Sequence, residues 1–272
     1  MRRSSAKRAA TSDRYDVRSV RRALALLKVL SNDESPLTLT ELAERAALNT
    51  STTFRLLSTL QHEGFVEQDK ETGKYSLGVA CLELGSAFLR SVSLRDQALP
   101  FLERLRDLCR ETVHLAILDQ DRMEAVYLEK LEGLLPIIYM ASRVGGRSPA
   151  YCTGIGKVLL SYEKPGHVEA FYSGQTLTRY TPNTIVAIDE LMAHLAGIRQ
   201  AGFGIDDEEH EPGVKCVAAP IWDGRGRAVA AFSVSGPRER IEQAIADDDL
   251  IGTVKSTAAE ISARLGERST VR

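Results

Sequence analysis

Residues 38–76 constrain the fold of this chain more than any other stretch, because their pattern orders three elements in sequence. A short helix is predicted over residues 40–46, and after a tight turn a second helix begins at Asn49 or Thr50, either of which can cap its free amides. A two-stranded hairpin is predicted over residues 66–76. This order predicts a winged helix-turn-helix, a fold that binds DNA.

The second predicted helix has two unlike faces. Its apolar positions recur at helical spacing and predict a buried stripe of Thr53, Leu56, Leu57 and Leu60. The opposite face carries short hydroxyl groups, which reach phosphates and base edges, and one forked guanidinium. We therefore expect DNA contacts from Thr50, Ser51, Thr52, Arg55 and Ser58 on the helix, and from Lys74 in the wing beside a turn glycine, Gly73. The alternative is a small helical domain whose hydroxyl-rich face is only solvated.

The charge distribution favours DNA binding at the amino-terminal end. Residues 1–28 contain nine basic and two acidic side chains, and residues 1–77 carry a net charge of +3 against −5 for the rest of the chain. Such a segment attracts the phosphate backbone. Residues 1–15 are polar and poor in large apolar side chains, which predicts a disordered arm that is either a solubilising tail or a minor-groove contact.

Length and composition bound the remaining possibilities. A chain of 272 residues predicts two domains. It has neither an apolar run of 18 residues nor the apolar core of a signal peptide, so we expect no membrane segment and a cytoplasmic location. The cysteines, Cys81, Cys109, Cys152 and Cys216, lack the paired spacing of a zinc site or a disulfide framework, so we expect reduced thiols and neither metal nor cofactor.

Helical and strand patterns organise the chain on either side of the predicted wing. A helix with an apolar stripe of Val20, Ala23, Leu24, Leu27 and Leu30 is expected to pack behind the reading helix. The expected domains are residues 16–78 for DNA binding, residues 79–94 for a linker helix and residues 95–268 for a second domain. A connector of about two helices (residues 79–110) could transmit movement, dimerise or only pack. Antiparallel strands are predicted at residues 113–118, 125–131, 134–141, 214–221 and 228–235, with one beginning at Gly204, and helices at residues 155–161, 188–200 and 251–265. This mixture predicts an α+β fold.

Three polar segments of the second domain are candidate ligand sites. Residues 151–157 form a loop that opens a helix, where free amides favour an anion. Residues 206–213 contain five acids around His210, four of them before it, which suggests either a metal site or, more simply, a solvated loop. Ser233 and Ser235 alternate onto one face of a strand, where a bound carboxylate is one candidate partner.

These segments, taken in order, resemble the IclR family of bacterial transcription regulators over nearly all of residues 15–266. The matching stretches are LNTSTTFRLL from Leu48, TGIGKVLL from Thr153, GIDDEEH from Gly204 through CVAAP from Cys216, and SVSGP from Ser233. The chain has Gly154-Ile155-Gly156-Lys157 where the family often has Ala-Leu-Gly-Lys, a difference that bears on pocket shape.

The resemblance implies a winged helix-turn-helix, a linker helix and an effector-binding domain with a GAF-like antiparallel sheet. It also implies homodimers or dimers of dimers, and an effector pocket for a small organic acid that involves Gly154, Ile155, Asp206, Cys216, Ser233 and Ser235.

The function that we expect is that of a one-component transcriptional regulator, such as a repressor, whose binding to a double-stranded DNA operator responds to a small organic acid. One alternative is an enzyme with an attached DNA-binding domain, in which Cys216 or Cys152 is the nucleophile and His210 the base. Another is an architectural DNA-binding protein whose second domain only oligomerises.

Overall fold

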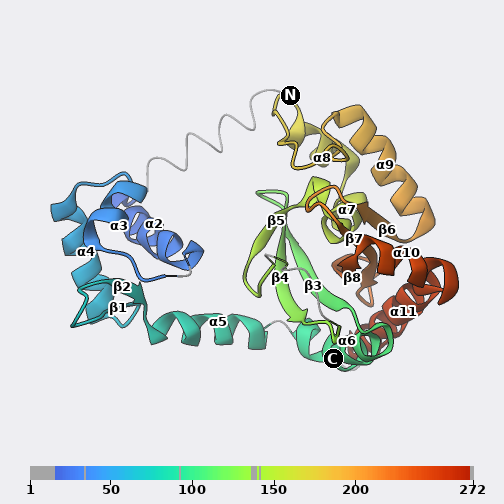
Figure 1. The fold of residues 1–272 in the computed structure, drawn as a ribbon, viewed down its shortest axis with the longest axis horizontal. Helices are drawn as coiled ribbons and strands as arrows, with labels where there is room; N and C mark the ends of the chain where they lie inside the picture. Colours follow the sequence, from blue (N-terminus) through green and yellow to red (C-terminus); the bar gives the residue numbers. More distant parts are fainter. Residues whose placement is uncertain (1–15, 34, 92, 136–139, 141, 270–272) are drawn as a thin grey trace. The chain divides into compact units, whose positions relative to one another are not determined.

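The computed structural model describes residues 16–33, 35–91, 93–135, 140 and 142–269. The chain divides into two compact units at residue 92 (Figure 1). Each unit has a hydrophobic core of its own.

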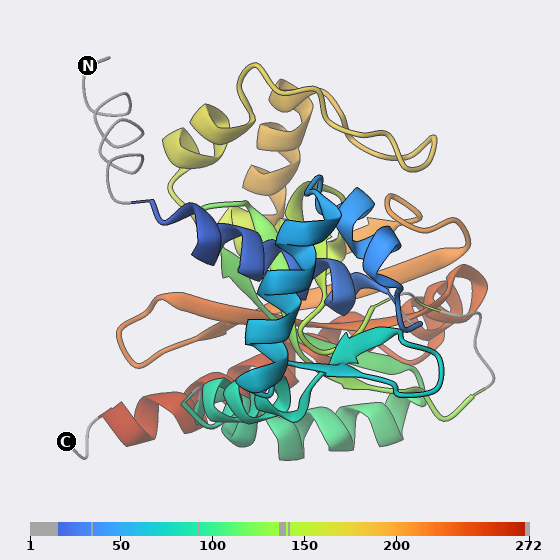
Figure 2. The same ribbon diagram turned by 90° about the vertical axis from the view of Figure 1, so that its left-hand side faces the viewer.

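The amino-terminal unit is a winged helix-turn-helix followed by a helix. Its elements are α2 (Arg18–Asn32), α3 (Leu39–Arg45), α4 (Thr50–His62), β1 (Val66–Gln68), β2 (Tyr75–Leu77) and α5 (Val79–Ser91). The two strands pair antiparallel, and the hairpin lies next to the end of α4 (Figure 2). The predicted order of elements is therefore confirmed.

Local side-chain chemistry explains where these elements begin. Thr38 and Glu41 form a reciprocal capping box at the start of α3. The side chain of Asn49 accepts a hydrogen bond from the amide of Thr52, 2.7 Å away, so Asn49 rather than Thr50 caps α4. In the wing, Gly73 has a φ of +68°, a conformation that a side chain disfavours.

The expected apolar stripe of α2 is partly wrong. Val20 and Leu24 are about half exposed, whereas Leu26 and Leu30 are buried against α3, α4 and the hairpin. Apolar residues occur around most of this helix, so their spacing alone did not define the buried face.

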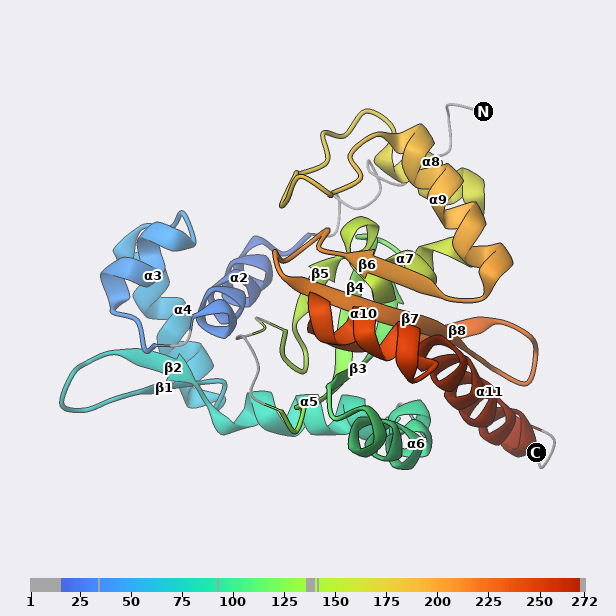
Figure 3. The ribbon, with the colours of Figure 1, turned by 45° about the vertical axis from the view of Figure 1, so that its right-hand side comes forward.

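The carboxy-terminal unit is built on one antiparallel sheet in the order β5-β4-β3-β8-β7-β6. Its strands are β3 (Thr112–Asp119), β4 (Glu124–Leu131), β5 (Arg147–Pro149), β6 (Gly204–Asp207), β7 (Val214–Trp222) and β8 (Ala228–Pro237). Its helices are α6 (Ser93–Cys109), the 3₁₀ turn η2 (Ala150–Cys152), α7 (Gly154–Ser161), α8 (Pro165–Tyr172), α9 (Ile188–Ala201), α10 (Arg238–Asp247) and α11 (Leu250–Ser269). Helices α6 and α11 pack together against the sheet, and α7 packs against it with α9 (Figure 3).

Several elements differ from the sequence-based expectation. The strand expected at residues 134–141 falls largely outside the described residues, and the strand that pairs with the outer edge of β4 is β5. Helices α8 and α10 were not predicted. Within the described part of the chain, no helix has the length and apolar character needed to cross a membrane.

Candidate functional site

The exposed face of α4 carries the residues predicted to contact DNA. Thr50, Ser51, Arg55 and Ser58 are exposed and Thr52 is half-buried, while Thr53 and Leu57 on the opposite face are fully buried. Lys74 is exposed in the wing.

Sequence reasoning missed Phe54, whose side chain is 55% exposed on α4. The exposure of Phe54 was predictable from the sequence, because Phe54 lies outside the helical spacing of the apolar positions in α4.

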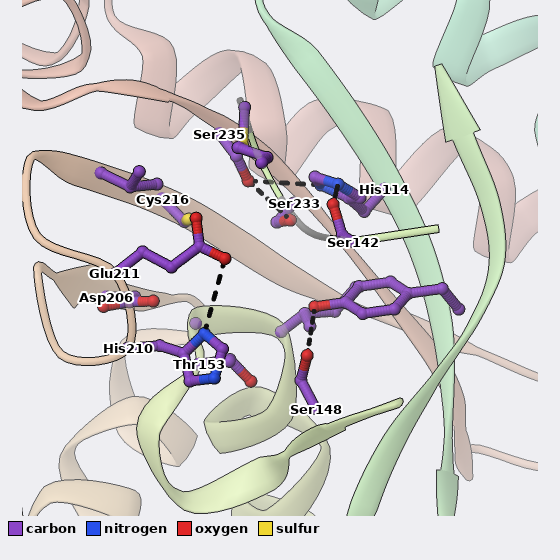
Figure 4. Close-up of a pocket in the computed structure, with 15 residues that line it drawn as sticks. His114, Ser142, Ser148, Thr153, Asp206, His210, Glu211, Cys216, Ser233 and Ser235 are labelled. Carbon is purple, nitrogen blue, oxygen red and sulfur yellow. Dashed lines mark hydrogen bonds and ion pairs between the residues drawn. The ribbon is translucent and has the colours of Figure 1, made fainter. Parts of the chain in front are cut away.

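The carboxy-terminal unit contains a cavity of about 450 Å³, including its opening to solvent. All six residues predicted for an effector pocket line it, namely Gly154, Ile155, Asp206, Cys216, Ser233 and Ser235. The other lining residues include side chains that sequence reasoning did not single out, among them His114, Ser142 and Ser148 (Figure 4) and Tyr127.

Strand register places three of these side chains in one row across the sheet. Asp206 on β6 lies opposite Cys216 on β7, and Cys216 lies opposite Ser235 on β8. Ser233, two residues before Ser235 and on the same face, lies opposite His114 on β3. Residues paired in this way present their side chains on one face of the sheet, which explains why residues from four strands meet at the cavity.

The hydroxyl groups and His114 form a hydrogen-bonded chain. Ser233 Oγ lies 3.2 Å from Ser235 Oγ, Ser235 Oγ lies 3.4 Å from His114 Nδ1, and His114 Nε2 lies 2.8 Å from Ser142 Oγ (Figure 4). Burial, with a further contribution from Lys130, lowers the pKa of His114 to about 3. The imidazole is therefore neutral at neutral pH, with one nitrogen as donor and the other as acceptor.

The start of α7 forms another wall of the cavity. Thr153 caps the helix by accepting a hydrogen bond from the amide of Gly156, 3.2 Å away. A Cβ at Gly154 would lie 3.3–3.4 Å from atoms of Asp206 and Cys216, so glycine allows the helix start to approach the sheet closely. The first amides of a helix have no partner within it, and they present partial positive charge to the cavity.

Lys157 lies behind this wall and is fully buried. Its Nζ forms an ion pair with Glu209, donates to the carbonyl of Ile205 at 2.7 Å and lies 3.2 Å from His194 Nε2. The loop that carries Glu209 is held from a second side, where Thr184 Oγ1 donates to the Glu209 carbonyl at 2.7 Å. Lys157 therefore anchors the loop that follows β6.

The expectation of a solvated acidic loop is consequently wrong for Asp206 and Glu209, which are 4% and 5% exposed. The cost of removing the Glu209 carboxylate from water is offset by its ion pair with Lys157. Lys157 lies about 50 positions earlier in the sequence, so the local pattern of residues 206–213 could not show it. No cluster of histidine, cysteine and carboxylate side chains suited to a metal ion occurs among the described residues.

The carboxyl group of Asp206 is buried at the cavity. Its Oδ1 accepts a hydrogen bond from the Glu209 amide at 2.7 Å, and burial raises its pKa to about 7.

The thiols of the cavity region are poor nucleophiles. Burial, reinforced by the negative charge of Asp206, raises the pKa of both Cys216 and Cys152, and burial lowers the pKa of His210. The imidazole of His210 packs against Tyr180, with ring centroids 4.8 Å apart and the ring planes tilted by 54°. Because the thiolate is the reactive form, these environments do not support the cysteine-dependent enzyme.

Comparison with known proteins agrees with this architecture. Residues 19–70 match the IclR helix-turn-helix domain, and residues 86–263 match the bacterial transcriptional regulator IclR C-terminal domain. The chain belongs to the IclR family. It is thus a DNA-binding transcriptional regulator with an effector-binding domain, and the relatives that it matches are regulators rather than enzymes.

Individual relatives cover most of the chain. The regulator XynR of Escherichia coli is 38% identical over 84% of this chain and 89% of its own length. The regulator KdgR of Escherichia coli is 35% identical over 92% of this chain and 93% of its own length. The crystal structure of an IclR homologue from Microbacterium hydrocarbonoxydans in complex with 4-hydroxybenzoate has a TM-score of 0.79 and 28% identity, and covers 91% of this chain and 98% of the homologue.

Proposed function

We propose that this IclR-family regulator binds an operator through α4 and its wing, and that a small organic acid bound in the carboxy-terminal cavity alters its affinity for DNA. The observation that carries the proposal is the convergence of Ser233 and Ser235 with the start of α7 on one cavity. Hydroxyl groups and helix-start amides are donors suited to a carboxylate.

The DNA-binding half of the proposal rests on the exposed face of α4. Thr50, Ser51, Thr52 and Ser58 offer short donors and acceptors to phosphates and base edges, and Arg55 offers a bidentate donor of the kind that recognises guanine. Phe54 adds an exposed apolar group suited to a thymine methyl. Lys74 in the wing would contact phosphate.

The effector half assigns the carboxylate to the amides at the start of α7 and to Ser233 and Ser235. Neutral His114 supports this arrangement through its hydrogen bond to Ser235. The family relative bound to 4-hydroxybenzoate supports an organic acid as the ligand class. We further propose that the protein is a homodimer or a dimer of dimers, because two copies would match the two half-sites of a symmetric operator. We also propose a cytoplasmic location.

A thermal-shift screen of small aliphatic and aromatic acids, followed by gel-shift titration with each hit, tests the proposal. Ligand at a hundredfold excess over its Kd adds about 2.7 kcal/mol of apparent stability, which is readily detected. The Ser233→Ala/Ser235→Ala variant should lose the response of DNA binding to the acid while binding DNA alone as wild type does. An unaltered response in the double variant would contradict the assignment.

A further inference from the structure

The cavity contains acids but no basic counter-charge. Among the described residues that line it, Asp206 and Glu211 carry carboxyl groups, and none is a lysine or arginine. Its two imidazoles, His114 and His210, have pKa values lowered by burial. When Asp206 is ionised, a carboxylate ligand is therefore repelled by one part of the cavity, and only neutral donors stabilise it in the other.

These two parts are separated within the sheet. Asp206 and Ser235 lie on either side of Cys216 in the cross-strand row, so their backbones are two strand spacings, or roughly 10 Å, apart. Figure 4 shows Asp206 and Glu211 on one side of the cavity and the serines with His114 on the other. A ligand that spans them has the serine hydroxyls at one end and the carboxyl groups at the other, with the start of α7 alongside Asp206 and Cys216.

Asp206 presents an unused acceptor to this space. Its carboxyl is 4% exposed, and only Oδ1 has a hydrogen-bond partner among the residues that the structure describes, the Glu209 amide. Its second oxygen, Oδ2, can accept a hydrogen bond from a ligand hydroxyl. A second ligand carboxylate cannot donate, and it adds like charge beside Asp206 and Glu211.

We propose that the effector is a monocarboxylate with a hydroxyl group at its far end, and that Asp206 accepts a hydrogen bond from this hydroxyl and excludes dicarboxylates. This inference rests on the proposed function, since it assumes that the cavity binds an acid. Glu211, whose side chain is 29% exposed, supplements the same end of the cavity more weakly.

Two sets of matched acids test the inference by isothermal titration calorimetry at pH 8.5, where Asp206, with its pKa of about 7, is ionised. One set is benzoate, 4-hydroxybenzoate and terephthalate, and the other is butyrate, 4-hydroxybutyrate and succinate. The aromatic acids differ only in the para substituent, which is hydrogen, hydroxyl or carboxylate. The aliphatic acids share a four-carbon chain whose far end is methyl, hydroxymethyl or carboxylate. For the set whose frame fits, we expect the hydroxy acid to bind at least tenfold more tightly than either companion, because sites built for a hydroxyl discriminate strongly against ligands that lack it.

Asp206→Asn isolates the role of the charge. The amide keeps an acceptor but loses the negative charge, so the Kd ratio of the dicarboxylate to the hydroxy acid should fall at least tenfold. Asp207→Asn is the matched control, because Asp207 points to the opposite face of β6 and pairs with Lys215 at 3.0 Å. It should leave the ratio unchanged.

The possible results distinguish binding of an acid by the cavity from selection of a hydroxy acid by Asp206. If no acid of either set binds, the proposed function is contradicted. If acids bind but the unsubstituted acid or the dicarboxylate binds as tightly as the hydroxy acid, the further inference is overturned and the proposed function stands. Equal effects of Asp206→Asn and Asp207→Asn on the ratio would also overturn it. The wild-type ranking decides the matter even if Asp206→Asn does not fold.

Discussion

Replacing Lys157 with methionine should destabilise the carboxy-terminal unit by about 3–5 kcal/mol, the usual effect of removing one partner from a buried ion pair. The lysine side chain is fully buried and Glu209 is 5% exposed, so the variant leaves a carboxylate with little access to water. It also removes the donor to the Ile205 carbonyl. Methionine preserves the length and apolar contacts of the side chain, so lost packing contributes little.

Urea unfolding followed by the fluorescence of Trp222, the single tryptophan of the chain, measures this change in the unit that contains it. Lys215→Met is the matched control. Lys215 pairs with Asp207 and Glu242 at 3.0 Å, but these acids are 45% and 44% exposed, so each stays hydrated when its partner is lost. Its removal should cost no more than about 1 kcal/mol.

A double variant distinguishes a stranded charge from a general packing defect. Lys157→Met/Glu209→Met removes both charges, and we expect it to recover at least about 2 kcal/mol relative to Lys157→Met, because apolar replacement of a whole buried pair is often nearly neutral. The stranded-charge explanation is refuted if Lys157→Met loses no more stability than Lys215→Met does. It is also refuted if the double variant is less stable than Lys157→Met.

Three further predictions concern DNA and pH. Arg55→Ala should weaken operator binding by about 1–3 kcal/mol with an unchanged Tm, and an unaltered gel-shift affinity would remove Arg55 from the reading face. Deleting residues 1–14 removes five basic side chains, so DNA affinity should fall and its salt dependence should become shallower, whereas equal salt slopes would show that the arm does not contact DNA. Burial raises the pKa of Asp206 to about 7, above its unfolded value, so its contribution to stability is lost as pH rises toward 7. The urea midpoint of Asp206→Asn relative to that of wild type should therefore be higher at pH 7.5 than at pH 5.5. An equal difference between the two midpoints at both pH values would contradict this.

Local signals in the sequence predicted much of the fold. The Asn49 cap, the positive φ of Gly73 and the shared face of Ser233 and Ser235 each depend on residues within a few positions of one another. Such features follow from helix and strand periodicity and from turn chemistry, which a single sequence contains.

The features that were missed depend on distant partners. Burial of Glu209 requires Lys157, 52 residues earlier in the chain, and the place of His114 in the cavity depends on its register with Ser233. A histidine within an apolar strand gives no local sign that it faces a ligand site. The buried face of α2 was likewise decided by packing against other elements.

An acid-lined cavity is compatible with an anionic effector because binding and discrimination are assigned to different ends of the ligand. Gly154 permits the close approach that brings the start of α7 to Asp206 and Cys216, so amide donors and a carboxyl acceptor lie on adjoining walls. When Asp206 is ionised, any carboxylate bound by the serines experiences some repulsion from it, which lowers affinity for every acid. A second carboxylate at the far end experiences much more, because Coulomb repulsion increases as the charges approach and as water is excluded. The cavity therefore loses affinity for acids in general and gains selectivity for those that place a hydrogen-bond donor beside Asp206.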